Sequence, residues 1–319
     1  MNSHSELKIF AGSGSEGFAQ KMCDYLGISI GKSRIRQYSD NNTYVKIEEK
    51  VRGMDVYIVQ TIGFDPNNQF MELLFWVDAF KRSSVASVTA IIPYFGYAKA
   101  DKKDEPRVSI RARVCADSLE AAGVDRVVVM DLHSPQIQGF FKKPVDHLYA
   151  AGIFLKDIKA RNIDNLVIAS PDEGFAKNAR YYSDKLDVPL VIGNKRRVGH
   201  DETAEIVGMT GDCTGKNVVV VDDFAISFGT HAAITRILKE KGAKDVYVYV
   251  THNMVTEKGL QKLMDSQVKM FITTDTVNNP RLDGCPRAVI LSVADLFGKT
   301  IKLIHDRESL GELFDQNGG

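Results

Sequence analysis

Short apolar runs alternate along the chain with segments in which apolar residues recur at every third or fourth position. The clearest run is four consecutive valines at 218–221. Such a run is typical of a parallel strand covered on both faces, because a strand with one wet face alternates apolar and polar residues. Comparable runs predict eight strands, near residues 55–60, 88–92, 126–130, 166–170, 188–192, 218–222, 246–250 and 269–273. Alternation of these strands with helical segments predicts an α/β fold with a mostly parallel sheet in each half.

Two segments of eleven residues, 123–133 and 242–252, indicate an internal duplication. Each begins with Gly, has Val at its fifth and seventh positions and ends with His. Each also follows a helical stretch, so Gly123 and Gly242 are expected at helix C-termini. We therefore expect an N-terminal domain at 1–147 and a C-terminal domain at 148–319. The last helix is expected to pack back on the first domain.

Composition limits the function classes. The 319 residues include 41 basic and 41 acidic side chains, so no net field favours nucleic acid or an anionic membrane as a partner. The four cysteines lie far apart without metal-type spacing, and we expect them to be reduced and buried. No apolar run approaches the roughly 18 residues that a membrane span needs, and the N-terminus lacks a signal-peptide pattern. These features predict a soluble cytoplasmic protein.

The candidate chemistry begins directly after the valine run. Asp222 and Asp223 are expected at the carboxyl end of that strand, where ligands of open α/β sheets bind, and two acids there can accept hydrogen bonds from vicinal ribose hydroxyls. Ser227, Gly229 and Thr230 follow at the start of a helix, whose free N–H groups favour a phosphate. The pattern predicts a sugar-phosphate site. The alternative is an ordinary strand-to-helix turn with an acidic cap.

Eight segments in one order carry a resemblance along nearly the whole chain. They are 7–12, 37–40, 92–99, 129–133, 136–141, 170–172, 194–197 and 218–230. Together they resemble the ribose-phosphate diphosphokinase family of the phosphoribosyltransferase superfamily. The resemblance implies two tandem phosphoribosyltransferase-like domains, each a mostly parallel sheet flanked by helices. It also implies a transferase of nucleotide biosynthesis that moves the β,γ-diphosphoryl group of Mg-ATP to the 1-hydroxyl of ribose 5-phosphate, releasing AMP.

The same resemblance implies roles for the charged residues that such a transfer needs. His133 and Asp172 match positions that bind Mg²⁺ on ATP, and Asp172 lies in the loop that grips the diphosphate and acceptor side. Lys195 and Arg197 match the catalytic loop and are assigned to the transition state, where positive charge is needed most. The alternatives are a hydrogen-bonded core histidine at 133 and a solvated basic turn at 194–199.

For ATP, the resemblance implies stacking on Tyr38, an acceptor for the adenine amino group at Asp40, and further contacts from Lys99 and Asp101. It places Tyr38 and Asp40 at a contact between subunits and implies a homo-oligomer, a hexamer built from dimers. The sequence also departs from the family here. Asn41 and Asn42 replace Gly-Glu, and Lys99 with Ala100 replaces Arg-Gln, so altered ATP affinity or nucleotide preference is expected.

The acceptor loop departs further. Ile226 replaces a third acid and Phe228 replaces a glycine, and Phe228 is expected either to turn outward or to narrow the 5-phosphate pocket. Two alternatives stay open: the same chemistry on a larger acceptor such as ADP-ribose, and a non-catalytic regulatory partner of a true synthetase. The presence of both strand-end acids, His133, Asp172 and the two cations argues against the partner role.

Overall fold

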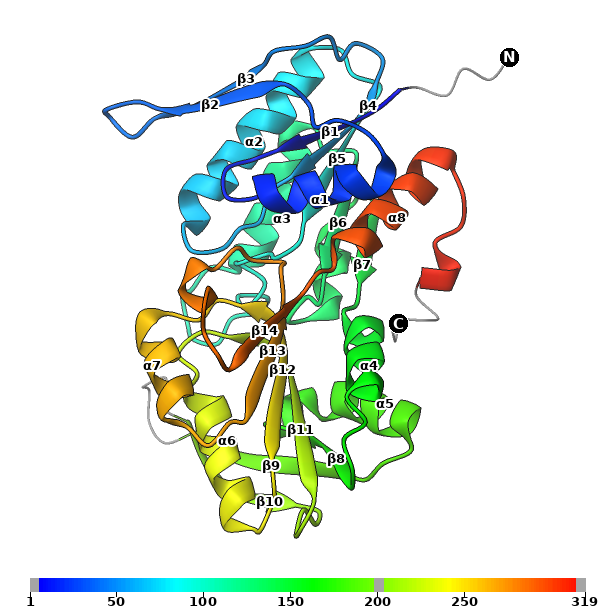
Figure 1. Cartoon of the computed structure of the whole chain (residues 1–319). Helices are drawn as coiled ribbons and strands as arrows, with labels where there is room; N and C mark the ends of the chain where they lie inside the picture. Colours follow the sequence, from blue (N-terminus) through cyan, green and yellow to red (C-terminus); the bar gives the residue numbers. More distant parts are fainter. Residues whose placement is uncertain (1–5, 198–203, 314–319) are drawn as a thin grey trace.

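Two mostly parallel β-sheets, one in each half of the chain, form the framework of the computed structural model, which describes residues 6–197 and 204–313 (Figure 1). The first sheet has the order β1-β4-β5-β6-β7, and all its pairs are parallel. Its strands are β1 Leu7–Ala11, β4 Asp55–Val59, β5 Ser87–Ile92, β6 Arg126–Met130 and β7 Val145–Leu148. An antiparallel hairpin, β2 Ser33–Gln37 and β3 Thr43–Ile47, extends from this half.

The second sheet has the order β10-β9-β8-β11-β12-β13-β14. Only β10 runs antiparallel, to β9. The strands are β8 Leu166–Ser170, β9 Leu190–Arg197, β10 Ala204–Thr210, β11 Asn217–Ala225, β12 Val246–Asn253, β13 Met270–Thr274 and β14 Ala288–Leu291. All eight predicted strands are present, and the predicted fold class is confirmed. The hairpin, β1, β7, β10 and β14 were not among the predicted strands.

Helices cover both sheets. Those of the first half are α1 Glu16–Leu26, α2 Pro66–Arg82 and α3 Arg111–Ala122, and those that follow are α4 Ala151–Ala160, α5 Ala176–Leu186, α6 Gly229–Glu240, α7 Glu257–Asp265 and α8 Ala294–Asp306. Gly123 and Gly242 follow α3 and α6 with positive φ, as their sequence context predicted. No helix among the described residues is long and apolar enough to cross a bilayer.

The valine run is buried on both faces of its sheet, as predicted, because α6 covers one face and α4 and α5 lie on the other. Val218 and Val220 join the core shared with Phe271, whereas Val219 and Val221 join the core of the opposite face. This second core continues into the first half of the chain. The two halves therefore share one packed layer.

The C-terminal helix α8 returns to the first half, as expected from the sequence. It lies beside α1 in Figure 1, and the Phe18 and Phe297 rings meet edge to face with centroids 5.4 Å apart. Gly298 allows close approach, since a Cβ there would come within 2.7 Å of the Tyr25 ring. The chain changes sheets between β7 and β8, and the domain boundary at 147/148 stays a prediction.

The cysteines are all free thiols. Cys23, Cys115 and Cys213 are buried as predicted, and Cys285 is only partly buried. Burial raises the pKa of Cys115 to about 12 and that of Cys23 to about 11. Such thiols carry little thiolate at neutral pH, so they fit an inert role.

Candidate active site

The acid pair lies in the second half of β11. Asp222 pairs in register with Val250 of β12, and Phe224 and Ala225 still pair with the same strand. The strand therefore continues beyond the acids, although the sequence pattern predicts the acids at its end. The Asp222 side chain keeps 15% of its surface exposed, and that of Asp223 keeps 10%. Asp222 thus presents the more accessible carboxylate.

Asp223 links the two halves of the chain. Its Oδ2 lies 2.7 Å from Nδ1 of His133, which follows β6 in the first half. The hydrogen bond to Asp223 raises the pKa of His133, and burial raises the pKa of Asp223. The alternative of a core histidine at 133 is not supported, because 44% of its side chain is exposed. The sequence predicted both residues for the site but not their direct contact.

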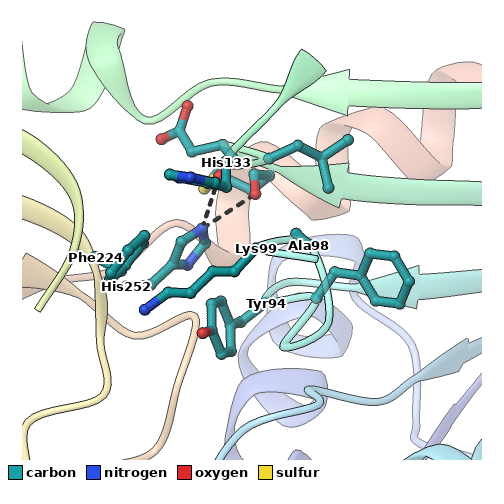
Figure 2. A pocket seen from close by; sticks show the side chains of 10 residues that line it. Tyr94, Ala98, Lys99, His133, Phe224 and His252 are labelled. Carbon is teal, nitrogen blue, oxygen red and sulfur yellow. Dashed lines mark hydrogen bonds between the residues drawn. The ribbon is translucent and has the colours of Figure 1, made fainter. Parts of the chain in front are cut away.

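A small pocket opens beside this pair, between the two sheets (Figure 2). Lys99 comes from the segment after β5, and its ammonium lies 3.3 Å from the centroid of the Phe224 ring. The same ring meets His133 edge-on at 5.5 Å between centroids. Phe224 therefore contacts both a cation and an imidazole. Cation–π attraction to the ring restricts the otherwise flexible lysine. The positive charge of Lys99 on this wall of the pocket favours an anionic ligand.

Hydrogen bonds to β12 of the second sheet hold the segment that carries His133. Asp131 has a positive φ of 36° and its carboxylate accepts a 2.7 Å hydrogen bond from the hydroxyl of Thr251 in β12. Nε2 of His252 lies 3.1 Å from the carbonyl oxygen of Met130 and 3.2 Å from that of Asp131 (Figure 2). Burial raises the pKa of Asp131 to about 6. These contacts fix the turn that ends β6.

A second buried histidine holds the same turn from the first half. The backbone N–H of Leu132 donates to Nε2 of His147 in β7 over 2.8 Å, which requires an unprotonated Nε2. Burial lowers the pKa of His147 to about 4, and burial also lowers that of His252 to about 4. Both rings are therefore neutral at physiological pH. His133 is thus positioned by two neutral histidines that are not among the site residues predicted from the sequence.

Asp172 follows β8 and begins a short turn. Its Oδ1 accepts the backbone N–H of Phe175 at 3.2 Å, and the Ser170 hydroxyl donates to the Asp172 carbonyl oxygen at 2.6 Å. Gly174 lies inside this turn, where a Cβ would come within 3.1 Å of Asp172 Oδ1. The predicted diphosphate loop is therefore a compact turn at a strand end, and its ligand role stays a prediction.

The loop before α6 corrects one expectation. Phe228 takes a left-handed conformation with φ 57°, and its ring is only 1% exposed and packs edge-on against Phe271 at 5.2 Å. The ring therefore neither turns outward nor narrows an acceptor pocket. It fills the core because the positive φ at the helix N-cap directs the side chain inward. For residue 228 only a backbone role in acceptor binding stays a prediction, beside Ser227, Gly229 and Thr230.

Ile226, which replaces an acid of the family pattern, also faces apolar neighbours. It packs against a small cluster of Tyr94, Met254 and Val277 that joins the two halves. Its carbonyl oxygen accepts the N–H of Thr256 at 3.0 Å. An apolar side chain at 226 therefore serves packing, and a partly buried carboxylate at this place would need a partner.

The left-handed backbone at 228 gives a stability prediction. Phe228→Gly and Phe228→Ala remove the same ring from the core, but only glycine adopts positive φ without strain. We expect the glycine variant to unfold at higher urea concentration, with an advantage of about 1 kcal/mol over the alanine variant. Equal stability of the two variants would mean that residue 228 leaves the left-handed conformation.

The structure separates two groups of predicted ATP residues. Lys99 lines the pocket, and the charge of Asp101 contributes to the raised pKa of His133. Tyr38 and Asp40 instead lie at the tip of the β2–β3 hairpin, where Tyr38 is 52% exposed (Figure 1). Hydrogen bonds from Asn42 lower the pKa of Asp40. Within one chain the hairpin residues do not line the pocket, so their adenine role requires another subunit and stays a prediction.

The basic segment 194–197 is strand rather than turn. β9 continues through Arg197, with Lys195 opposite Ile206 and Arg197 opposite Ala204 of β10. Up to Arg197 the backbone is therefore neither the loop that the family resemblance implied nor the basic turn of the alternative, because pairing with β10 extends the strand. Residues 198 and 199 lie outside the described residues. Ile192 of β9 pairs with Ser170 of β8. Lys195 and Arg197 therefore lie further along β9 in the direction in which β8 continues to the turn at Asp172.

Two parallel sheets, an acid pair in one of them and a histidine contributed by the other define a two-domain enzyme of the phosphoribosyltransferase class. Residues 7–123 match the N-terminal domain of ribose phosphate pyrophosphokinase, and residues 200–315 match the phosphoribosyl synthetase-associated domain. The chain is 41% identical to ribose-phosphate pyrophosphokinase of Porphyromonas gingivalis, over 98% of this chain and 99% of the relative. It is 39% identical to the enzyme of that name from a Nostoc species, over 98% and 95%.

The fold agrees with these relatives. The crystal structure of phosphoribosylpyrophosphate synthetase from Mycobacterium smegmatis superposes with a TM-score of 0.90 at 34% identity, covering 95% of this chain and 100% of that one. The chain belongs to the ribose-phosphate pyrophosphokinase family, whose members are ATP-dependent diphosphotransferases. The resemblance drawn from the eight sequence segments is confirmed.

Proposed function

We propose that the protein transfers the β,γ-diphosphoryl group of Mg-ATP to the 1-hydroxyl of ribose 5-phosphate, giving phosphoribosyl diphosphate and AMP. The observation that carries the proposal is the acid pair in β11, of which the Asp222 side chain keeps 15% of its surface exposed and Asp223 is bonded to His133 across the interface between the sheets. Asp222 and Asp223 accept the ribose hydroxyls. Ser227, Gly229 and Thr230 hold the 5-phosphate at the N-terminus of α6.

In this proposal the first half of the chain supplies the nucleotide side. Lys99 and His133 face the phosphates from the pocket wall, and Lys195 and Arg197 neutralise charge that develops as the bond to the α-phosphate breaks. Tyr38 and Asp40 of a neighbouring subunit hold adenine. This arrangement needs an oligomer, and a hexamer built from dimers in the cytoplasm stays the prediction from the family resemblance.

Magnesium fits the donor set. Nδ1 of His133 is engaged by Asp223, so Nε2 is left to face a ligand, which is the carboxylate–histidine arrangement common beside bound metals. Among the described residues no three His, Cys, Asp or Glu side chains form a group that could hold a metal ion. An ion held mainly by substrate phosphates and water needs no such group. His133 and Asp172 would hold Mg²⁺ on ATP, and the ion would neutralise the β- and γ-phosphates.

Removing either proposed ligand should raise the Mg²⁺ concentration required for half-maximal turnover by about tenfold or more. His133→Ala and Asp172→Asn are suitable, because asparagine retains an acceptor for the Phe175 N–H while losing the charge. Glu173→Ala, which removes the adjacent exposed acid, is the matched control. An unchanged magnesium titration in both variants would return His133 and Asp172 to structural roles.

Ribose 5-phosphate is favoured over ADP-ribose because the Phe228 ring, which motivated a larger acceptor, lies in the core. A regulatory partner without activity is not favoured either, because the chain belongs to an enzyme family along its whole length. The deciding experiment incubates the protein with Mg-ATP and each acceptor and resolves products by mass. We expect AMP and phosphoribosyl diphosphate with ribose 5-phosphate. Product from ADP-ribose alone, or none from either, would contradict the proposal.

A further inference from the structure

Asp222, the other acid of the pair, also has a histidine partner, and this histidine is buried. Nε2 of His231, in the first turn of α6, lies 2.9 Å from Oδ2 of Asp222. The His231 side chain is 4% exposed and its ring lies beside that of Phe228, with centroids 5.2 Å apart. Because the His231 side chain is screened from solvent, a ligand that contacts the Asp222 carboxylate does not reach His231.

The two oxygens of the Asp222 carboxylate are held by different donors. Oδ2 is bonded to His231, and Oδ1 accepts the backbone N–H of Asp223 at 3.0 Å. Two bonds on opposite oxygens fix the rotation of the carboxylate plane. Each oxygen still has a lone pair for a hydroxyl, because a carboxylate offers about four acceptor positions. The accessible acid is thus oriented before any ligand arrives.

The two histidines anchor the acids in different ways. His133 comes from the first half, so the orientation of Asp223 depends on how the halves meet. His231 follows Asp222 by nine residues in the same half and is packed into its core. The orientation of Asp222 is therefore built into the second half alone. A carboxylate that is already oriented lowers the free-energy cost of binding a sugar, because less conformational freedom is lost on binding.

We propose that His231 is a positioning residue for the sugar acceptor: it orients the Asp222 carboxylate toward the vicinal hydroxyls and thereby sets KM for ribose 5-phosphate without contacting it. This inference rests on the proposed function. Because ATP binding does not involve Asp222 in that function, the effect is confined to the acceptor.

The test compares three substitutions at His231. His231→Leu removes the donor and keeps an apolar side chain of moderate size, His231→Gln keeps an amide N–H that can reach Asp222, and His231→Asn keeps an amide that is too short. We expect KM for ribose 5-phosphate to rise about tenfold in the leucine and asparagine variants, which corresponds to about 1.4 kcal/mol. The glutamine variant should recover most of the wild-type value, and KM for ATP should change less than twofold in all three.

Thr235→Val is the matched control. Thr235 is buried in the next turn of α6, and its hydroxyl donates to the His231 carbonyl oxygen over 2.7 Å, so the change removes a buried hydrogen bond without touching the ring. It should lower the unfolding midpoint and leave both KM values unchanged. A merely structural role of His231 would give the same result in the leucine variant, and that outcome would overturn the proposal. Equal rises in KM for ribose 5-phosphate and in KM for ATP would also overturn the proposal.

Failure of the proposed function gives a different result. If the wild type forms no product from ribose 5-phosphate, the proposed reaction is wrong whatever the variants do. The hydrogen bond itself is tested without substrate by long-range ¹H–¹⁵N NMR of the His231 ring, assigned with His231→Gln. We expect a proton on Nε2. A ring protonated only on Nδ1 cannot donate to Asp222 and would refute the positioning role.

Discussion

Replacing Lys195 or Arg197 by alanine should lower kcat by about 10²-fold or more while ATP affinity changes little. The expectation follows from where charge develops. In diphosphoryl transfer the anionic charge shifts as the bond to the α-phosphate breaks, so a cation that meets it only in the transition state affects turnover and not ground-state binding. Arginine adds two parallel hydrogen bonds to phosphate oxygens, whereas lysine acts as a point charge.

The backbone supports this assignment. Ile192 of β9 is opposite Ser170 of β8, and the backbone of Lys195 lies three residues, roughly 10 Å, further along the strand direction. The same direction leads from Ser170 to the turn at Asp172. The cations therefore come from a ribbon that extends past the strand end where the diphosphate is proposed to bind.

Arg196→Ala is the control for this prediction, because it removes the same charge from the same ribbon. Steady-state kinetics at saturating Mg²⁺ give kcat, and calorimetry gives ATP affinity. We expect Arg196→Ala to retain near-normal turnover. Near-normal turnover in Lys195→Ala and Arg197→Ala as well would remove both residues from the transition-state role.

The sheets could be predicted from the sequence because strands buried on both faces are written as continuous apolar runs, as at Val218–Val221. The β2–β3 hairpin and β10, which were not predicted, lack this signature. The β2–β3 hairpin alternates polar and apolar residues on an exposed ribbon, and β10 follows the described part of β9 across residues 198–203. Pairing with a neighbour, rather than burial, makes these segments extended.

Within the site, the sequence predicted which strands would contribute residues but not which side chains would meet. The internal duplication is instructive. His133 and His252 end the two matching segments and both line the pocket, yet His133 is half-exposed beside Asp223 and His252 is buried. The positive φ at Asp131 ends β6 early, while β12 continues to Asn253. Tertiary packing alone decides this difference.

Phe228 and His231 show a second limit of sequence reasoning. A phenylalanine in place of a loop glycine suggested a changed ligand pocket, because its left-handed backbone and its space in the core beside Phe271 are not written locally. His231 carried no motif at all. Only the fold brings the His231 ring to Asp222, so the sequence alone could not indicate a role for His231.

Acidification should destabilise the protein through two neutral histidines, His147 and His252. Burial lowers the pKa of each to about 4, whereas an unfolded histidine titrates near 6.5. The unfolded chain therefore takes up protons first, and stability that is present above pH 6.5 is lost as the pH falls toward 4. Each histidine accounts for about 3 kcal/mol over this range, since one pKa unit corresponds to about 1.4 kcal/mol.

Urea unfolding at half-unit steps from pH 7.5 to 4.5 measures this loss. We expect His147→Gln and His252→Gln each to reduce the slope of unfolding free energy against pH by up to about 1.4 kcal/mol per pH unit, and the double variant to reduce it further. Thr276→Val is the control, because its hydroxyl is bonded to Nδ1 of His252 but does not titrate in this range. That variant should lose stability equally at every pH. A double variant with the wild-type slope would show that neither ring is neutral in the fold.

Protonation of His147 and His252 should also affect the candidate active site. Protonating His147 removes the acceptor for the Leu132 N–H, and protonating His252 places a charge beneath the turn at Asp131. Both changes release the segment that presents His133 to Asp223. We therefore expect the magnesium requirement to rise below pH 5.5 before global unfolding begins, and to rise less in His147→Gln, whose amide oxygen still accepts the Leu132 N–H without taking up a proton. A magnesium requirement that stays constant until the protein unfolds would separate the two buried histidines from the function of His133.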